Sequence, residues 1–144
     1  MEKSFTIKMK KTGEMQFTTT FDKDFPELLF DEPESVTGGL DQYPNASRVL
    51  TAAVANCLSA SFTFCANKMR VPVKELETSA TCAIDRNEEG YSRIKNISVE
   101  IHPTFEPEAE EKKQNRCIGI FRNYCVVSKS VQEGIDISVD IKPE

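Results

Sequence analysis

The sequence has a single histidine, no Cys-x-x-Cys motif and no block of basic residues among its 144 residues. One histidine and widely spaced cysteines give no zinc-binding pattern, so we expect no metal site. A formal net charge of −5 without a basic cluster excludes nucleic acid as an expected partner. The first residues lack the apolar segment of a signal peptide, which predicts a cytoplasmic protein whose cysteines stay reduced.

An apolar run does occur at residues 49–66, but it is a little short of the roughly 20 residues that span a bilayer. It also contains Asn56 and several hydroxyl groups, so we expect a buried core helix and no membrane partner. A chain of this length buries about 70% of its unfolded surface. No shift in composition marks a boundary, and we therefore expect one domain over residues 1–144.

Two periodic patterns predict the first half of the secondary structure. Apolar and polar residues alternate from Phe5 to Phe21 with a break at Gly13, which predicts a β-hairpin. A long loop with a short strand near residues 28–30 is expected to follow. Helical spacing covers residues 45–69, where small and apolar side chains on every side predict a helix that is buried all round.

In the second half of the chain, strand-like alternation is again followed by helical spacing. Alternation over residues 76–84 and 97–101 predicts a long hairpin with one wet face. We expect a helix over residues 106–124, a short helix over 126–132 and a final alternating strand over 135–141. Hairpins grouped around one buried helix predict an α+β fold.

Two cysteines are candidates for chemistry. Cys57 lies in the middle of the apolar helix, and Cys125 lies near the start of a short helix, where free N–H groups favour a thiolate. An isolated cysteine at either position is more often a small buried hydrophobe. The lone His102 has no second histidine to form a metal site and lies on the wet face of a strand. The remaining cysteines are expected to pack in the core: Cys65, Cys82 and Cys117.

The order of several short motifs favours a chemical role for Cys57 and Cys125 over a purely structural one. The first half of the chain carries Asp31-Glu32-Pro33, Gly38-Gly39-Leu40-Asp41, Tyr43-Pro44-Asn45 and Leu50-Thr51-Ala52-Ala53-Val54-Ala55-Asn56-Cys57. The second half carries Arg122-Asn123-Tyr124-Cys125-Val126-Val127-Ser128-Lys129. Together these motifs resemble the OsmC/Ohr family, which comprises osmotically inducible protein C and the organic hydroperoxide resistance proteins. The resemblance extends from about residue 5 to residue 142.

This resemblance implies an OsmC-like fold, with an antiparallel curved sheet around a long buried central helix in an intertwined homodimer. It also implies a peroxidase of organic hydroperoxides in which Cys57 attacks the peroxide and Cys125 is the resolving thiol. A thiolate that attacks an O–O bond becomes a sulfenic acid, and a second thiol condenses with it before further oxidation. Such a reaction needs no cofactor and only an external dithiol as reductant.

The sequence departs from the family pattern in its charges. Active members place a glutamate ten residues before the first cysteine, where it orients an arginine; here that position is Ser47, followed by Arg48. One interpretation is that Arg48 supplies the activating cation and that Glu14 or another carboxylate holds it. On an unbroken helix Arg48 would point away from Cys57, so this needs a bend near Leu50. The alternative is a divergent, non-catalytic OsmC-like dimer that binds an apolar small molecule or senses redox state.

Overall fold

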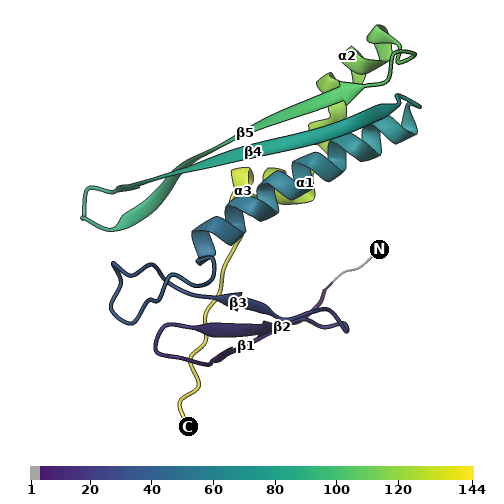
Figure 1. Cartoon of the computed structure of the whole chain (residues 1–144). Coiled ribbons are helices and arrows are strands. Elements are labelled where there is room, and N and C mark those ends of the chain that lie inside the picture. Colours follow the sequence, from purple (N-terminus) through teal and green to yellow (C-terminus); the bar gives the residue numbers. More distant parts are fainter. Residues whose placement is uncertain (1–3) are drawn as a thin grey trace. The chain divides into compact units, whose positions relative to one another are not determined.

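The computed structural model describes residues 4–144, and Figure 1 shows the elements in chain order. The chain folds as two compact units, and the boundary between them falls after Leu50. Helix α1 (Ala46–Lys68) begins in the first unit, and most of its length belongs to the second. Among residues 4–144 the strand pairs are all antiparallel, and helices follow each sheet in the chain, which makes this the α+β fold that the sequence predicts.

The first unit is a small antiparallel sheet. Its strands are β1 (Lys8–Lys11), β2 (Phe17–Thr20) and β3 (Leu28–Phe30), in the order β1-β2-β3. Phe17 of the central strand pairs with Lys11 on one side and Phe30 on the other. The expected hairpin and the short third strand are therefore both confirmed.

The loop after β3 is organised around a buried carboxylate. Asp31 is only 1% exposed, and its oxygens accept hydrogen bonds from the backbone N–H groups of Glu32, Leu40 and Gln42 at 2.7, 3.2 and 2.9 Å. The side chain of Gln16 in the β1–β2 connection donates a fourth bond at 2.6 Å. One aspartate thus joins both ends of a long loop to the hairpin beside it.

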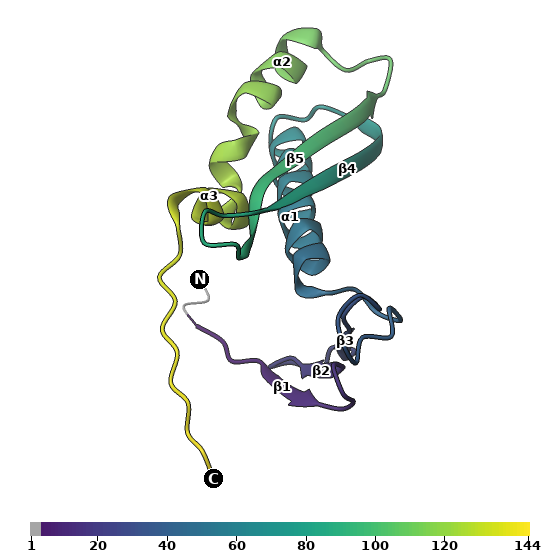
Figure 2. The same ribbon diagram turned by 90° about the vertical axis from the view of Figure 1, so that its left-hand side faces the viewer.

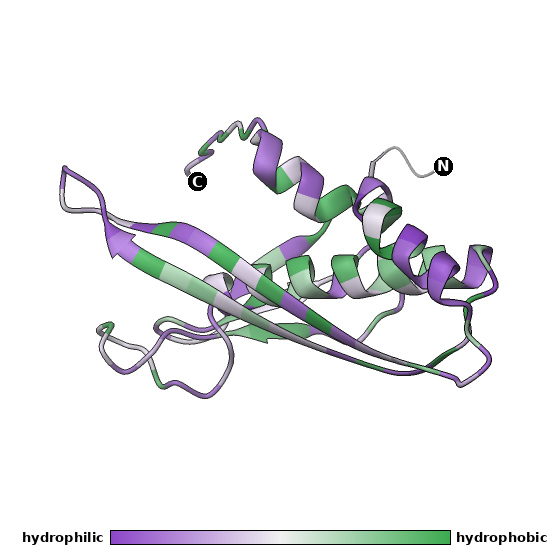
Figure 3. Ribbon diagram, turned by 90° about the horizontal axis from the view of Figure 1, so that it is seen from above, coloured by the Kyte–Doolittle hydropathy of each residue, from purple (hydrophilic) through white to green (hydrophobic). Residues whose placement is uncertain are grey.

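The second unit is built on a long hairpin with α1 alongside it (Figures 1 and 2). Strands β4 (Val73–Arg86) and β5 (Ser92–Phe105) pair from Val73 with Phe105 to Arg86 with Ser92, with two irregularities in register. Figure 3 shows hydrophobic and hydrophilic residues alternating along these strands. One face of the hairpin is therefore available to pack against the helices, and the other remains wet.

Three short helical segments complete this unit. They are α2 (Glu111–Ile120), the 3-10 turn η1 (Phe121–Tyr124) and α3 (Val126–Glu133). The sequence places the first of these helices too early, because the chain makes a separate turn in which the N–H of Ala109 bonds to the carbonyl of Glu106 before α2 begins. The short helix ends where the sequence predicts, at Gly134, which has a φ of 82°.

The core of the second unit consists of two clusters that both include α1. One joins Phe62, Cys65 and Ala66 of α1 to Val71 and to Cys117 of α2. The other joins Val54 and Leu58 of α1 to Cys125, with β5 residues packed against them: Ile97, Val99 and Ile101. These contacts fix α1 between the hairpin and the helices that follow it in sequence.

Burial of α1 within one chain is less complete than the sequence predicts. Only six of its residues are buried: Val54, Leu58, Ser61, Phe62, Cys65 and Ala66. By length and composition the helix could cross a membrane, and 39% of its most apolar window is buried. The core helix of a soluble protein passes the same test, so this is weak evidence for a membrane span. A helix that is apolar all round but buried along one side leaves apolar surface for other contacts.

The prediction of a final strand over residues 135–141 is wrong for the single chain. This segment pairs with no strand among residues 4–144, although its residues alternate as the pattern indicates. Its apolar side chains are largely exposed, with 84% of Ile137 and 82% of Val139 accessible. The alternation is that of a strand, but within the described residues it forms no strand pairing.

Candidate active site

Cys57 and Cys125 lie together at the start of α3, although they are far apart in the sequence. Cys57 is half-buried on α1, whereas Cys125 is the N-cap residue of α3 and only 1% exposed. The N–H of Val127 donates to Cys57 Sγ at 3.4 Å, and the N–H of Ser128 donates to Cys125 Sγ at the same distance. The first turn of α3 therefore directs one free N–H group to each sulfur.

The surroundings of Cys125 favour its charged form. Burial is the largest influence and raises the pKa of the Cys125 thiol, but hydrogen bonds act against it. These come from the Cys57 thiol, from the side chain and backbone of Ser128 and from the side chain of Ser61, and the net pKa of Cys125 lies below its ordinary value. Donors that face a sulfur stabilise a thiolate more than a thiol.

A cavity of about 530 Å³ lies beside residues that pack around Cys125, although neither Cys57 nor Cys125 is among its lining residues. Its walls include Val54 and Leu58 of the cluster around Cys125, together with Ser128 of α3. Most of the remaining lining is apolar, and the basic side chains of Lys95 and Arg122 also reach it. A pocket with apolar walls and a few polar groups is suited to an apolar small molecule.

The three residues considered as sources of an activating charge lie in the first unit. Ser47 and Arg48 belong to the first turn of α1, and the N–H and guanidinium of Arg48 donate to Asn45 Oδ1 at 3.2 and 3.3 Å. Glu14 is exposed, and its side chain lies where a Cβ atom would project from Gly38. α1 continues as a helix past Leu50, so the placement of Arg48 near Cys57 stays a prediction that would need a bend in this helix.

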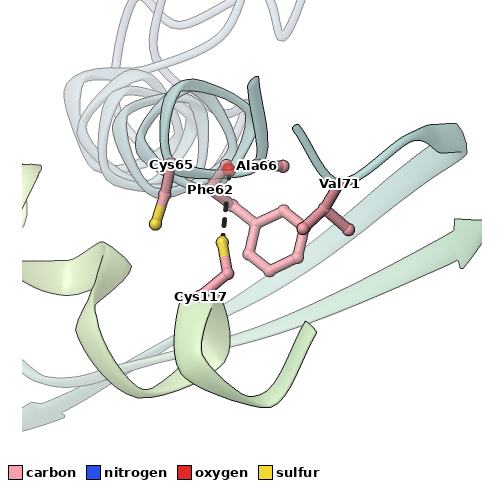
Figure 4. Packing of buried hydrophobic residues seen from close by; sticks show 5 residues of the cluster. All are labelled: Phe62, Cys65, Ala66, Val71 and Cys117. Carbon is pink, nitrogen blue, oxygen red and sulfur yellow. Dashed lines mark hydrogen bonds between the residues drawn. The ribbon is translucent and has the colours of Figure 1, made fainter. Parts of the chain in front are cut away.

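The other cysteines occupy different surroundings. Figure 4 shows the sulfurs of Cys65 and Cys117 between α1 and α2, with Cys117 Sγ 3.9 Å from the carbonyl oxygen of Phe62. Burial raises the pKa of Cys117 to about 12, and a hydrogen bond and charge interaction with Cys65 act in the same direction. Both residues are at most 1% exposed, and the thiol of Cys117 stays protonated at neutral pH. Cys82 is half-buried on β4, opposite Ile97 of β5.

No group of three or more potential metal ligands occurs among residues 4–144. The imidazole of His102 lies 3.3 Å from the carboxylate of Glu100 on the exposed face of β5. The groups that face the two sulfurs are thiols, hydroxyls and backbone N–H groups.

The sequence alone does not identify two residues of the site. Ser61 lies one helical turn after Cys57 on α1, and Ser128 is the third residue of α3, after its N-cap Cys125. The Cys-x-x-Ser spacing at the start of a short helix could have indicated that Ser128 lies next to Cys125, because an N-cap side chain bonds to the N–H three residues later. Nothing in the sequence places Ser61 next to Cys125, since that contact depends on the packing of α1 against α3.

Comparison with known proteins agrees with this architecture. Residues 39–140 match the family described as OsmC-like protein. An OsmC-like protein from Vibrio cholerae superposes with a TM-score of 0.77 at 14% identity, covering 91% of this chain and 95% of its own. An OsmC-like protein from Mycoplasma pneumoniae gives 0.74 at 16% identity, with 92% and 89% covered.

An organic hydroperoxide resistance protein from Elizabethkingia anophelis, with thiocyanate bound, is similar in the same way. Its TM-score is 0.65 at 20% identity, and the match covers 92% of this chain and 91% of its own. No curated protein is similar in sequence. At these identities the likeness to solved structures concerns the fold.

Proposed function

The chain belongs to the OsmC family, and from this premise we propose that it reduces organic hydroperoxides by a thiol mechanism. Membership and the organic hydroperoxide resistance proteins among its structural neighbours support a redox-related role. In the proposed reaction Cys57 attacks the peroxide and Cys125 resolves the resulting sulfenic acid as a disulfide. An external dithiol then reduces the disulfide in the cytoplasm, and no cofactor takes part.

The observation that carries this proposal is the meeting of the two sulfurs at the start of α3. Each accepts a backbone N–H at 3.4 Å, so both can be held in a defined position. The cavity of about 530 Å³ that is lined by Leu58 and Ser128 would admit an apolar hydroperoxide to the neighbourhood of this pair. Cys57 is the more exposed of the two thiols and is therefore the one that a substrate would reach first.

Consumption of an organic hydroperoxide is the test of this function. We expect the full chain to consume tert-butyl hydroperoxide catalytically in the presence of dithiothreitol, and Cys57→Ser to consume none above the background rate. Cys82→Ser is the matched control, because it removes a half-buried thiol outside the site. Equal consumption by the wild type and Cys57→Ser would contradict a peroxidase mechanism at this residue.

The cavity also favours a second candidate, an OsmC-like module that binds an apolar small molecule or senses redox state without turnover. Its apolar walls would suit such a ligand whether or not Cys57 reacts. Saturable binding of an apolar fluorescent probe by a wild type that shows no peroxide consumption would favour this alternative.

We further propose that the protein works as a homodimer. The exposed side of α1 carries the small residues Ala52, Ala53 and Ala60 together with Phe64, which is 53% exposed. Residues 135–141 form an alternating segment that pairs with no strand among the described residues 4–144. A second copy could cover the helix and supply a sheet edge to this segment, and burial of both surfaces would stabilise the assembly.

A further inference from the structure

The polar groups around Cys125 are arranged as they would be around an anion. Its sulfur accepts the Ser128 N–H at 3.4 Å from the N-cap position of α3. The side chains of Ser61 and Ser128 approach it as well, and each residue is only 6% exposed. Although it lies beside Cys125, the buried Ser128 hydroxyl forms no hydrogen bond of good geometry in the structure. A buried donor without an acceptor is costly, and a negative charge on Cys125 would remove that cost.

The thiol of Cys57 faces this potential anion. The two sulfurs accept N–H groups from adjacent residues, Val127 and Ser128, and the interaction with the Cys57 thiol is one of those that lower the pKa of Cys125. Cys57 is half-buried while Cys125 is 1% exposed, so a substrate reaches Cys57 first, and its thiol must lose a proton before it can attack. The attacking residue therefore needs a base, and the nearest sulfur is placed to act as one.

Resting on the peroxidase function proposed above, we infer that Cys125 is the base that takes the proton of Cys57, in addition to resolving the sulfenic acid. Ser61, Ser128 and the first turn of α3 position Cys125 as an anion. Position 47, ten residues before Cys57, is a serine, so no charged side chain stands there.

The atoms and electrons balance over two steps. The proton of Cys57 passes to Cys125, and the Cys57 thiolate attacks the terminal oxygen of the hydroperoxide. An S–O bond forms, the O–O bond breaks, and the departing alkoxide takes the proton back from Cys125 to leave as an alcohol. The Cys57 sulfur has lost two electrons and the peroxide has gained two. The Cys125 thiolate then attacks Cys57, so that an S–S bond forms and hydroxide leaves as water after protonation by solvent.

Few other charges face the pair. Apolar residues pack around Cys125 from α1, β5, η1 and α3. The basic side chains that line the adjoining cavity are Lys95 of β5 and Arg122 of η1, and the guanidinium of Arg122 donates to Gln132 Oε1 at 3.2 Å. An activating cation from this cavity is the competing explanation, and Arg122→Gln tests it directly.

The experiment measures the first oxidation of Cys57, not steady-state turnover. The reduced chain is mixed with tert-butyl hydroperoxide, and Cys57 sulfenic acid and its disulfide are quantified by dimedone trapping and mass spectrometry across a pH series. If Cys125 only resolves, Cys125→Ser forms sulfenic acid at the wild-type rate. If it is also the base, we expect that rate to fall at least about 100-fold at neutral pH and its pH midpoint to move upward. A wild-type rate and pH profile in Cys125→Ser would overturn the proposal.

The serines provide a second test that keeps both thiols. We expect Ser61→Ala and Ser128→Ala to move the pH midpoint of the first oxidation upward, with Thr63→Ala as the matched control. Thr63 lies on the same helix, but its exposed hydroxyl bonds to the carbonyl of Ser59. If Cys125→Ser does not fold, the variant that combines Ser61→Ala with Ser128→Ala decides. An unchanged pH midpoint of its first oxidation overturns the proposal. A loss in Arg122→Gln as large as that in Cys125→Ser would also overturn it.

A measurement without peroxide separates this inference from the proposed function. Thiolate absorbance in the ultraviolet should be lost in Cys125→Ser at neutral pH and retained in Cys57→Ser. Failure of the wild type to oxidise Cys57 would contradict the peroxidase function, whereas this absorbance tests the charge on Cys125 alone. Loss of the thiolate signal in Cys57→Ser with its retention in Cys125→Ser would place the charge on Cys57 and overturn the inference.

Discussion

The five cysteines of this chain show how strongly local surroundings decide the chemistry of one residue type. Cys57 and Cys125 face N–H groups and hydroxyls at the start of a helix, and the pKa of Cys125 is lowered. Cys65 and Cys117 face each other inside an apolar cluster, and burial raises the pKa of Cys117 to about 12. Both arrangements are adjacent pairs, but only the first favours a thiolate.

Mild oxidation should therefore form a disulfide in only one of these two cysteine pairs. We expect diamide to form the Cys57–Cys125 disulfide in the folded chain at neutral pH and to leave Cys65 and Cys117 reduced, because exchange requires a thiolate. Mass spectrometry of non-reduced peptides measures both products. In denaturant, where the surroundings no longer differ, the selectivity should disappear. A Cys65–Cys117 disulfide appearing first in the folded chain would contradict the assignment.

A different buried residue, Asp31, gives the first unit a dependence on pH. Burial raises the pKa of this carboxyl, but the hydrogen bonds from Gln42, Gln16, Glu32 and Leu40 outweigh burial and lower it from 3.8 to about 2. The unfolded state then binds a proton that the folded state excludes. Stability from Asp31 is complete above the ordinary value and is lost as the pH falls from about 4 towards 2.

Substitution of Asp31 by asparagine should remove both the stability and its pH dependence. An amide cannot accept bonds from all four donors, so we expect Asp31→Asn to unfold at lower urea concentration at neutral pH. Its midpoint should also fall less between pH 4 and 2 than that of the wild type. Backbone NMR signals of residues 8–30 report on this unit directly. Asp22→Asn, at an exposed aspartate, is the control and should change stability by no more than about 0.5 kcal/mol.

At the level of elements, the loop between β3 and α1 depends on one close approach of the backbone. A Cβ atom on Gly39 would overlap the carbonyl oxygens of Glu32 and Pro33. The first of these carbonyls accepts the N–H of Asp41 at 3.0 Å, so moving it away would break a bond of the loop. The glycine is required here by space, not by a left-handed backbone.

Two glycine-to-alanine substitutions should consequently change the stability of the chain in opposite directions. We expect Gly39→Ala to destabilise the chain by on the order of 2–3 kcal/mol, because rigid backbone atoms must move. Gly119→Ala, in the last turn of α2 with no atom near its added Cβ, should stabilise it by about 0.5 kcal/mol. Thermal unfolding of both variants measures the difference. Equal effects of the two substitutions would contradict the close approach at Gly39.

Most elements could be predicted from the sequence because their periodicity is local. The hairpins, α1 and α3 follow from alternation or helical spacing within each segment. The sequence places the start of α2 too early because Glu106 and the following acids suit either a first helical turn or a separate turn. The candidate pair of Cys57 and Cys125 follows from family resemblance, whereas Ser61 and Ser128 become visible only when α1 and α3 are packed together.

At the scale of the whole molecule, the chain leaves unusual amounts of ordered apolar surface uncovered. Only six residues of α1 are buried, and every apolar side chain of the C-terminal alternating segment is largely exposed: Ile135, Ile137, Val139 and Ile141. A soluble chain seldom keeps a regular apolar row in water, and an unpaired strand with such a row is a template for another sheet edge. No strand among residues 4–144 pairs with this segment, and in the proposed homodimer a second copy would supply the partner.

If a second copy pairs with this segment, one polar substitution on its apolar face should dissociate the homodimer. Ile137 is 84% exposed in the single chain, and burying such a side chain contributes about 1.5–3 kcal/mol. An aspartate there would lose that contribution and bury a charge in both copies. We therefore expect sedimentation equilibrium at micromolar concentration to give a dimer for the wild type and mostly monomer for Ile137→Asp. Ser138→Asp adds the same charge on the opposite face and should remain dimeric, because alternate residues of a strand point to opposite sides. A folded wild-type monomer at this concentration would contradict the homodimer, and dissociation by Ser138→Asp alone would place the other face of the segment in the interface.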